Sequence, residues 1–338
     1  MTTIAAVGYT RSLPVDDTES LLDLQVASPA PRPHDLVVEV RAVSVNPVDV
    51  KVRAGGDPDG PRVLGFDAAG VVREVGEAVT LFSPGDEVWY AGDITRPGTN
   101  AALHAVDERI VGRKPTTLSF AEAAALPLTT ITAWEALFDK LGLAPASEGT
   151  LLVVGATGGV GSILLQLAER LLPEVTVIAT ASRPEGVEWV RSLGAEHVVD
   201  HRGDLVTEVL AVAPGGVDWI FTAHSAGMVD AFVEVLAPFG AVVAIDDPET
   251  LDVRALKSKS LSWHWELMFT RAIQGRADMV RQHELLDRVA DLVDRGEVRT
   301  TMTTLLSPID AAHLREAHRL VESGRVIGKV VVSDDPAS

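Results

Sequence analysis

The sequence contains no cysteine among its 338 residues. Disulfide bonds, thiolate nucleophiles and every zinc site that needs sulfur ligands are therefore excluded. Long apolar stretches are also missing, because no run approaches the roughly 18–20 residues that a membrane span requires. The N-terminal residues lack the pattern of a signal peptide, so we expect a cytoplasmic protein with no membrane partner.

Basic residues are scarce as well. Twenty-nine lysines and arginines stand against 48 aspartates and glutamates, which gives a formal net charge of −19. Such a chain repels a phosphate backbone, so we expect no nucleic-acid partner. The nine histidines form no H-E-x-x-H or other chelating pattern, and the sequence therefore predicts no metal site.

The length exceeds that of a usual single domain and indicates two lobes. Residues up to about 120 read as strands and turns. A capping box formed by Ser119 and Glu122 then begins a helical stretch. The expected strands of this first part are Asp35–Val45, Gly65–Val75 and Glu87–Tyr90.

Short apolar runs alternate with helical segments from Thr150 to Ile245, which predicts a parallel, doubly wound sheet. An apolar-aromatic segment after Leu261 is expected to be a loop. A helix over 278–295 and a strand over 330–332 complete the chain. The expected strands of the sheet are Thr150–Val154, Thr176–Thr180, His197–Val199, Val217–Thr222 and Ala241–Ile245.

A glycine-rich turn follows the first of these strands. It contains Gly155, Gly158, Gly159, Val160 and Gly161, and a helix over 160–172 comes after it. Glycines let the backbone approach a pyrophosphate that rests on the amides at the helix N-terminus. The first glycine of the usual G-x-G-x-x-G is an alanine here, so the context of strand and helix carries the prediction of dinucleotide binding. The alternative is a tight turn that only packs strand against helix.

The end of the second strand distinguishes NADPH from NADH. A carboxylate about twenty residues after the glycine motif would bind the 2′-hydroxyl of NAD. Ala179–Arg183 contains no carboxylate, whereas Ser182 and Arg183 offer a donor and a cation for a 2′-phosphate. The sequence therefore predicts NADPH as cofactor, with a solvent-exposed turn as the alternative.

Four further motifs resemble the medium-chain dehydrogenase/reductase superfamily, and within it the zinc-type alcohol dehydrogenase-like proteins of the zinc-free quinone oxidoreductase branch. They are Asn46–Lys51 (NPVDVK), Gly65–Val72 (GFDAAGVV), Pro84–Val88 (PGDEV) and Ala123–Trp134 (AAALPLTTITAW).

The resemblance implies an α/β protein, with a GroES-like β-barrel lobe plus a Rossmann doubly wound parallel sheet. The expected domains are a GroES-like catalytic domain over 1–124 and 264–338 and an NADPH-binding domain over 125–263. It also implies that Asn46 and Phe66 stand where zinc relatives carry two of their ligands and that the third ligand position falls near Leu128, so catalytic zinc is not expected.

The same resemblance singles out catalytic residues. Asn46 is a neutral group that suits polarising a carbonyl, or else it caps the turn before Pro47. Lys51 is a general acid or a solvated lysine, and both interpretations stay open. Asp49 is expected to orient Lys51 or a backbone amide. Tyr90 is a pocket wall, a proton donor or a core residue.

Other residues are expected near the cofactor. Thr132 matches a threonine that contacts nicotinamide in the family, with a buried helical threonine as the alternative. His201 and Arg202 stand where relatives place a tyrosine and a basic residue around the adenosine phosphate, and His201 is otherwise a surface residue. Trp263 borders the substrate pocket or packs in the core or at a dimer contact.

The sequence as a whole therefore predicts an NADPH-dependent oxidoreductase that transfers hydride to a quinone or an α,β-unsaturated carbonyl without zinc, its partner being that small molecule. The resemblance implies a homodimer. Two rival functions are a non-catalytic NADPH-binding sensor or structural protein, and an alcohol dehydrogenase with an atypical metal site.

Overall fold

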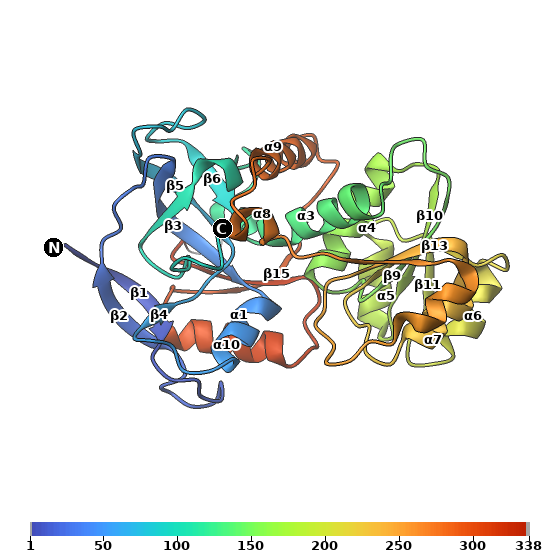
Figure 1. Ribbon diagram of the computed structural model, residues 1–338. Helices are drawn as coiled ribbons and strands as arrows, with labels where there is room; N and C mark the ends of the chain where they lie inside the picture. The colour runs from blue at the N-terminus through green and yellow to red at the C-terminus, as the bar shows by residue number, and fades with distance from the viewer. Residues whose placement is uncertain (1, 336–338) are drawn as a thin grey trace. The chain divides into compact units, whose positions relative to one another are not determined.

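The computed structural model describes residues 2–335 and divides them into two compact units (Figure 1). The first unit runs to Ile131 and resumes at Phe269, and the second spans Thr132–Met268. Both divisions come later in the chain than the expected boundaries after residues 124 and 263. Helix α3 (Pro127–Trp134) carries the chain across the first division, and a strand at Ser262–Trp265 belongs to the second unit's sheet.

The first unit is rich in strands. Strand β3 (Asp35–Val45) is its centre, because it pairs antiparallel with three others, β5, β7 and β16. The other elements are β1 (Thr3–Tyr9), β2 (Leu22–Ala27), α1 (Pro47–Ala54), β4 (Arg62–Val63), β5 (Ala68–Val75), β6 (Glu87–Tyr90), β7 (Leu103–Asp107), η1 (Glu108–Ile110), β8 (Val111–Arg113), α2 (Phe120–Ala124), α8 (Thr270–Ile273), α9 (Val280–Asp294), β15 (Met302–Leu306), α10 (Ala311–Glu322) and β16 (Lys329–Ser333).

The C-terminal segment completes the core of this unit. Leu36, Val38 and Val43 of β3 are fully buried, and Leu314 of α10 and Val330 of β16 pack into the same cluster. Helix α10 lies beside α1 (Figure 1). The two ends of the chain therefore share one hydrophobic core.

The second unit has a six-stranded parallel sheet. Its order is β11-β10-β9-β12-β13-β14, which is the doubly wound order of a Rossmann fold. Its elements are η2 (Glu135–Lys140), β9 (Gly149–Val154), α4 (Gly159–Leu171), β10 (Val175–Thr180), α5 (Pro184–Arg191), β11 (His197–Val199), α6 (Leu205–Val212), β12 (Val217–Thr222), α7 (Val229–Val235), β13 (Leu236–Ala244), η3 (Val253–Lys259) and β14 (Ser262–Trp265).

The predicted α/β architecture is confirmed, and the five expected parallel strands are present. The prediction of a loop after Leu261 was wrong, because Ser262–Trp265 forms β14 and pairs with β13 over Ala241–Ala244. Its alternation of Ser, Trp, His and Trp is compatible with a strand, but the resemblance pointed to a loop that borders the substrate pocket. None of the helices described for residues 2–335 has the length and hydropathy needed to span a bilayer.

Candidate active site

The glycine-rich turn joins β9 to α4 in the second unit. Gly155 has a positive φ of 85°, which favours glycine, and its N–H donates to the Thr180 hydroxyl at 3.1 Å. A side chain at Gly155 would meet Ala223, whose own N–H donates to the Val154 carbonyl at 3.2 Å. The turn is therefore held between the carboxyl ends of β10 and β12.

Two other glycines of the turn have different reasons to be glycine. A Cβ on Gly161 would lie 2.5 Å from Ala156 Cα and 2.6 Å from the Gly155 carbonyl oxygen, so the close packing of α4 on the turn requires glycine there. A Cβ on Gly158 would have 3.5 Å to its nearest neighbour, which is ordinary contact. Because the protein itself leaves room at Gly158, a pyrophosphate approaching the α4 amides explains that glycine best.

The predicted turn residues therefore come together at one place. Gly158 is the N-cap of α4, and Gly159, Val160 and Gly161 form its first turn. Strands β9 and β12 are neighbours, while the chain continues from them toward opposite edges of the sheet. Ligands of open α/β sheets bind in the crevice at such a switch point.

Arginines gather beyond the turn, where the adenosine part of a dinucleotide binds in Rossmann folds. The guanidinium of Arg202 donates to the Ser182 carbonyl and pairs with Asp200 at 3.2 Å. Arg183 is half-buried and lies 3.5 Å from Glu185. Ser182 thus accepts from the guanidinium of Arg202 and directly precedes Arg183 in the chain. The sequence analysis noted both arginines, Arg202 for its place directly after β11.

Three other predicted cofactor residues take different positions. His201 is exposed in the turn after β11, and Thr132 is buried in α3. Trp263 packs against Phe232 of α7 at a centroid distance of 6.5 Å and against Trp265 at 5.8 Å. These contacts place Trp263 against the core of the sheet.

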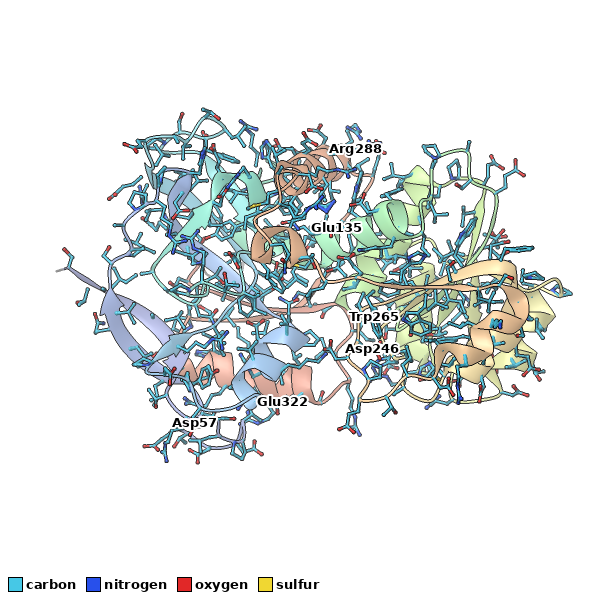
Figure 2. The ribbon with its side chains drawn as sticks, viewed as in Figure 1. Asp57, Glu135, Asp246, Trp265, Arg288 and Glu322 are labelled. Atoms are coloured by element: carbon cyan, nitrogen blue, oxygen red, sulfur yellow. The ribbon has the colours of Figure 1, made fainter. Side chains whose placement is uncertain are left out.

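The carboxyl ends of β12 and β13 are tied together by residues that the sequence analysis missed. Buried Ser225 donates its N–H to Asp246 at 2.7 Å and its hydroxyl to the same carboxylate at 2.8 Å. Figure 2 marks Asp246 and, at the end of the neighbouring strand, Trp265. The pair fixes two loops at the edge where the switch point lies.

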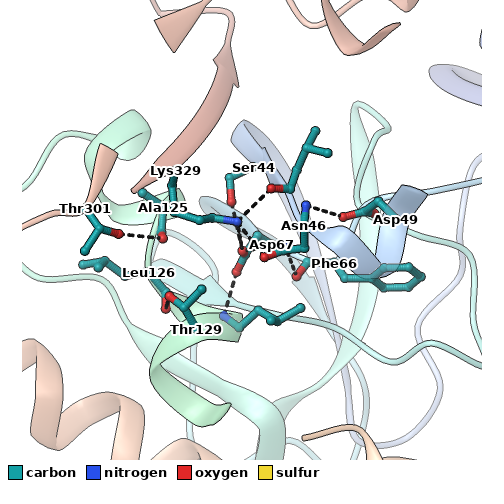
Figure 3. Close-up of polar contacts among 12 residues, drawn as sticks. Ser44, Asn46, Asp49, Phe66, Asp67, Ala125, Leu126, Thr129, Thr301 and Lys329 are labelled. Atoms are coloured by element: carbon teal, nitrogen blue, oxygen red, sulfur yellow. Dashed lines mark hydrogen bonds and ion pairs between the residues drawn. The ribbon is translucent and has the colours of Figure 1, made fainter. Parts of the chain in front are cut away.

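A buried polar cluster occupies the first unit where β3, β5 and β16 meet (Figure 3). Lys329 is 4% exposed, and its ammonium donates to the Asn46 side-chain oxygen at 2.6 Å and to the Val45 carbonyl at 2.9 Å. The ammonium also lies 3.3 Å from an Asp67 oxygen. Asn46 is 1% exposed and donates its amide to Asp67 at 2.8 Å.

Strand register builds this cluster. Strand β16 pairs with β3 from Val330 opposite Val45, so one further residue brings Lys329 opposite Asn46. Strand β5 pairs with β3 from Ala68 opposite Val43, and one further step places Asp67 opposite Ser44. The Ser44 hydroxyl donates to Asp67 at 2.9 Å, and the Leu128 N–H donates to the other oxygen at 2.8 Å.

Asp49 lies beside the cluster at the start of α1. Its carboxylate accepts the Asn46 N–H at 2.8 Å and the Gly65 N–H at 3.0 Å. Burial raises the pKa of Asp49 to about 7, although these bonds and Lys329 favour the ionised form. Burial likewise raises the pKa of Asp67 and lowers the pKa of Lys329, with their mutual attraction opposing both shifts.

The two other predicted catalytic residues lie apart from the cluster. Lys51 is exposed on α1. Tyr90 is fully buried and stacks on His104 at 5.5 Å. Since His104 Nε2 faces the Pro97 carbonyl at 3.0 Å it must carry the proton, so Nδ1 accepts the Tyr90 O–H at 3.2 Å. The Tyr90 proton is engaged in the core, and burial raises the pKa of the phenol.

Comparison with known proteins identifies the family. A model of the alcohol dehydrogenase GroES-like domain matches residues 32–133, and a model of the zinc-binding dehydrogenases matches residues 193–332. A zinc-type alcohol dehydrogenase-like protein of Staphylococcus aureus is 38% identical over 335 residues, which are 97% of this chain and 99% of the relative. The chain belongs to the medium-chain dehydrogenase/reductase superfamily.

Within the superfamily, the chain groups with the zinc-type alcohol dehydrogenase-like proteins, as expected. The first unit is thus its GroES-like lobe and the second its Rossmann lobe. The 2-methylene-furan-3-one reductase of Solanum lycopersicum is 32% identical, over 93% of this chain and 76% of the relative. A solved Rhizobium etli structure, assigned by name to the zinc-dependent alcohol dehydrogenases, is 53% identical and superposes with a TM-score of 0.95 over 100% of both chains.

The names of several relatives mention zinc, but the residues present in this chain do not fit a zinc ion. Phe66 stands at one ligand position that the resemblance implies and Leu128 lies near another, and neither has a side-chain donor atom. The oxygen of Asn46, at the remaining position, accepts from Lys329. Over residues 2–335, no three His, Asp or Glu side chains are arranged to hold a metal ion. Zinc needs three or four converging ligands, and this donor set does not supply them.

Lys329 is the principal residue of the buried polar cluster that the sequence analysis missed. Its partner Asn46 lies 283 positions earlier in the chain, so no local spacing relates the two. The available signal was a single charge at the start of the apolar strand Val330–Val332. Charges in such places are rarely buried without a partner, and the predicted carboxylates were available to provide one.

Proposed function

We propose that this protein is an NADPH-dependent reductase of quinones or α,β-unsaturated carbonyl compounds and that it works without zinc. The observation that carries the proposal is that Arg183 directly follows Ser182 and that the Ser182 carbonyl accepts from the guanidinium of Arg202. Guanidinium groups recognise phosphate through paired hydrogen bonds, whereas a free ribose hydroxyl is recognised by a carboxylate. This arrangement favours NADPH over NADH.

The proposed substrate class follows from hydride transfer by the cofactor without a metal and from the name of one relative. Bound NADPH would supply a hydride, and the protein would orient the substrate and supply a proton to the reduced product. The tomato relative is named for the reduction of an enone, which supports a conjugated carbonyl as acceptor. A quinone is the same kind of acceptor, because it also combines a carbonyl with a conjugated double bond.

The proposed roles follow the burial of the residues. Asn46 and Asp49 are buried and hydrogen-bonded, so we assign them the positioning of the α1 N-terminus. Lys51 is exposed on the same helix, and its ammonium can donate a proton. Tyr90 donates to His104 and has no proposed part in the chemistry.

Anaerobic oxidation of NADPH and NADH by chelator-treated protein tests the proposal, with 1,2-naphthoquinone and an alkyl vinyl ketone as acceptors. We expect turnover with NADPH that the chelator does not change. Arg183→Ala should raise KM for NADPH roughly tenfold while leaving KM for NADH unchanged, because one charge-assisted bond is lost. Arg191→Ala, at the exposed far end of α5, is the matched control.

Other outcomes of the same assay identify the rival functions. Tight binding of NADPH with no turnover of either acceptor would favour a sensor or structural protein. Oxidation of a simple alcohol that is lost on chelation would favour an alcohol dehydrogenase with an atypical metal site, and the proposal would then be abandoned.

The proposal includes a homodimer that forms at the edge of the Rossmann sheet. Strand β14 is the edge strand, and Trp265 and Leu267 at its end are 48% and 53% exposed (Figure 2). Large apolar side chains at an unpaired sheet edge favour association. Sedimentation should give a dimer, and Trp265→Lys should shift it to monomer.

A further inference from the structure

The ammonium of Lys329 has three oxygen neighbours and three N–H bonds to give. The oxygens belong to Val45, Asn46 and Asp67, at 2.9, 2.6 and 3.3 Å. A lysine ammonium has three donors and no acceptor, and here it makes two hydrogen bonds and one ion pair. The side chain is therefore built into the site as a buried cation with three oxygen partners.

The positive charge of Lys329 stabilises two buried carboxylates, Asp49 and Asp67. Asp49 and Asp67 are both about as buried as the core valines around them, at 1% and 0% exposure. Isolated buried carboxylates are costly, and a nearby cation offsets part of that cost. Lys329 is the cation that stabilises the ionised form of both carboxylates.

The same ammonium blocks a metal. Zinc bound to an oxygen ligand lies about 2.0–2.2 Å from it. The Asn46 oxygen already has the Lys329 nitrogen 2.6 Å away, and the Asp67 oxygen that accepts the Asn46 amide lies 3.3 Å from the same nitrogen. A metal ion and this ammonium cannot both contact the Asn46 oxygen and Asp67.

We propose that Lys329 is the resident cation of the active site, and that it does there what zinc does in the metal-dependent members of the superfamily: it holds residue 46 and neutralises the adjoining carboxylate. Lys329 acts through Asn46 and Asp67, so it is a positioning residue. Asn46 caps α1, which carries Lys51, and Asp67 accepts the N–H of Leu128 in α3. Loss of the charge should therefore disorder the groups that orient the substrate. The inference rests on the proposed function only for its activity assay.

Lys329→Met tests the charge, because methionine keeps an unbranched side chain without the ammonium. We expect kcat for quinone reduction to fall at least tenfold with KM for NADPH unchanged, since the nucleotide turn belongs to the other unit. Lys114→Met is the matched control, because Lys114 is also a buried lysine of this unit that donates to carbonyls, at 2.9 Å to Pro115 and 2.6 Å to Leu118. It should lose stability but not kcat.

Lys329→Ala tests whether a free cation can fill the place. Ethylammonium should raise Tm of Lys329→Ala, and restore part of kcat, relative to equal concentrations of tetramethylammonium, which has no N–H to donate. Wild type should respond equally to both salts. An equal response of Lys329→Ala to the two salts would overturn the proposal.

A double-variant comparison covers the case in which single variants fold poorly. Breaking the pair in Lys329→Met should lower Tm by on the order of 10 °C, because Asp67 stays buried without its cation. Asp67→Asn/Lys329→Met removes both charges and should recover part of that loss. If the decrease in Tm of the double variant equalled the sum of the decreases in Lys329→Met and in Asp67→Asn, the role of the charge would be contradicted. These melting curves need no substrate, so they stand even if the reductase activity is absent.

Discussion

His318 is a buried side chain that the chemistry does not use. It lies on α10 with no exposed surface, and neither ring nitrogen has a hydrogen-bond partner among residues 2–335. Burial lowers its pKa to about 3, and the nearby Arg53 adds to the shift. The folded state therefore holds the neutral ring, while the unfolded chain takes up a proton below about pH 6.5. The contribution of the neutral His318 ring to the stability of the fold is therefore present above that pH and is lost as the pH falls toward 3.

Replacing this ring by an aliphatic side chain should protect the protein against acid. We expect the effect of His318→Leu on the free energy of unfolding to be more favourable at about pH 5 than at pH 8, by about 2 kcal/mol. Urea titrations at the two pH values measure the difference. His201→Leu, at an exposed position, should show no such dependence on pH, and equal effects of both substitutions would contradict the explanation.

At this scale the sequence predicted the residue types of the site better than their partners. Asn46 and Asp49 were identified, and the structure brings them together at one helix start. Lys51 was chosen from the resemblance to the family, yet the lysine beside Asn46 is Lys329. Tyr90 was named among possible proton donors, and only the fold shows its hydroxyl turned to His104. Long-range register decides such contacts, and no local pattern contains it.

The turn between β9 and α4 separates two kinds of glycine. Gly158→Ala should leave Tm unchanged, because its Cβ has 3.5 Å of room and its φ of −77° suits any residue. The new methyl group would nevertheless obstruct the pyrophosphate, so NADPH affinity should fall roughly tenfold or more. Calorimetric titration with NADPH measures the affinity and calorimetric melting the stability.

Gly161→Ala makes the opposite prediction. Its Cβ would lie 2.5–2.7 Å from backbone atoms of Gly155 and Ala156, so the turn must shift and Tm should fall by several degrees. The two substitutions thus distinguish a glycine kept for the ligand from one kept for packing. If Gly158→Ala lowered Tm as much as Gly161→Ala, the turn would be a packing feature only.

Elements with a clear period were predicted well. Strands His197–Val199 and Val217–Thr222 were placed with the bounds that the structure has, and β9 and β10 each begin one residue earlier than expected. These are buried parallel strands, which appear in sequence as short β-branched runs between helices. Strand β14 was not predicted, because its tryptophans suggested the border of a pocket rather than an edge strand.

The acidity of the whole chain predicts a response to salt. With a net charge of −19, the folded protein repels itself over distances that about 10 mM salt screens poorly, whereas the Debye length falls to about 8 Å near 150 mM. Tm at pH 8 should therefore rise by a few degrees over this range. The rise should vanish near the isoelectric point of about 4.8, and a rise of equal size there would point to general salting effects.

The pairing of β16 with β3 determines when the barrel can fold during synthesis on the ribosome. The barrel needs β16 beside β3, and Lys329 is made 283 positions after Asn46. At about 5–20 residues per second, translation leaves this interval at roughly 15–60 s. Until Lys329 is made, the nascent barrel carries Asp49 and Asp67 without their counterion, whereas the Rossmann segment is complete once Met268 has been added. Strand β16, which is made after the whole Rossmann segment, therefore supplies the positive charge, and the barrel closes only when that strand is available.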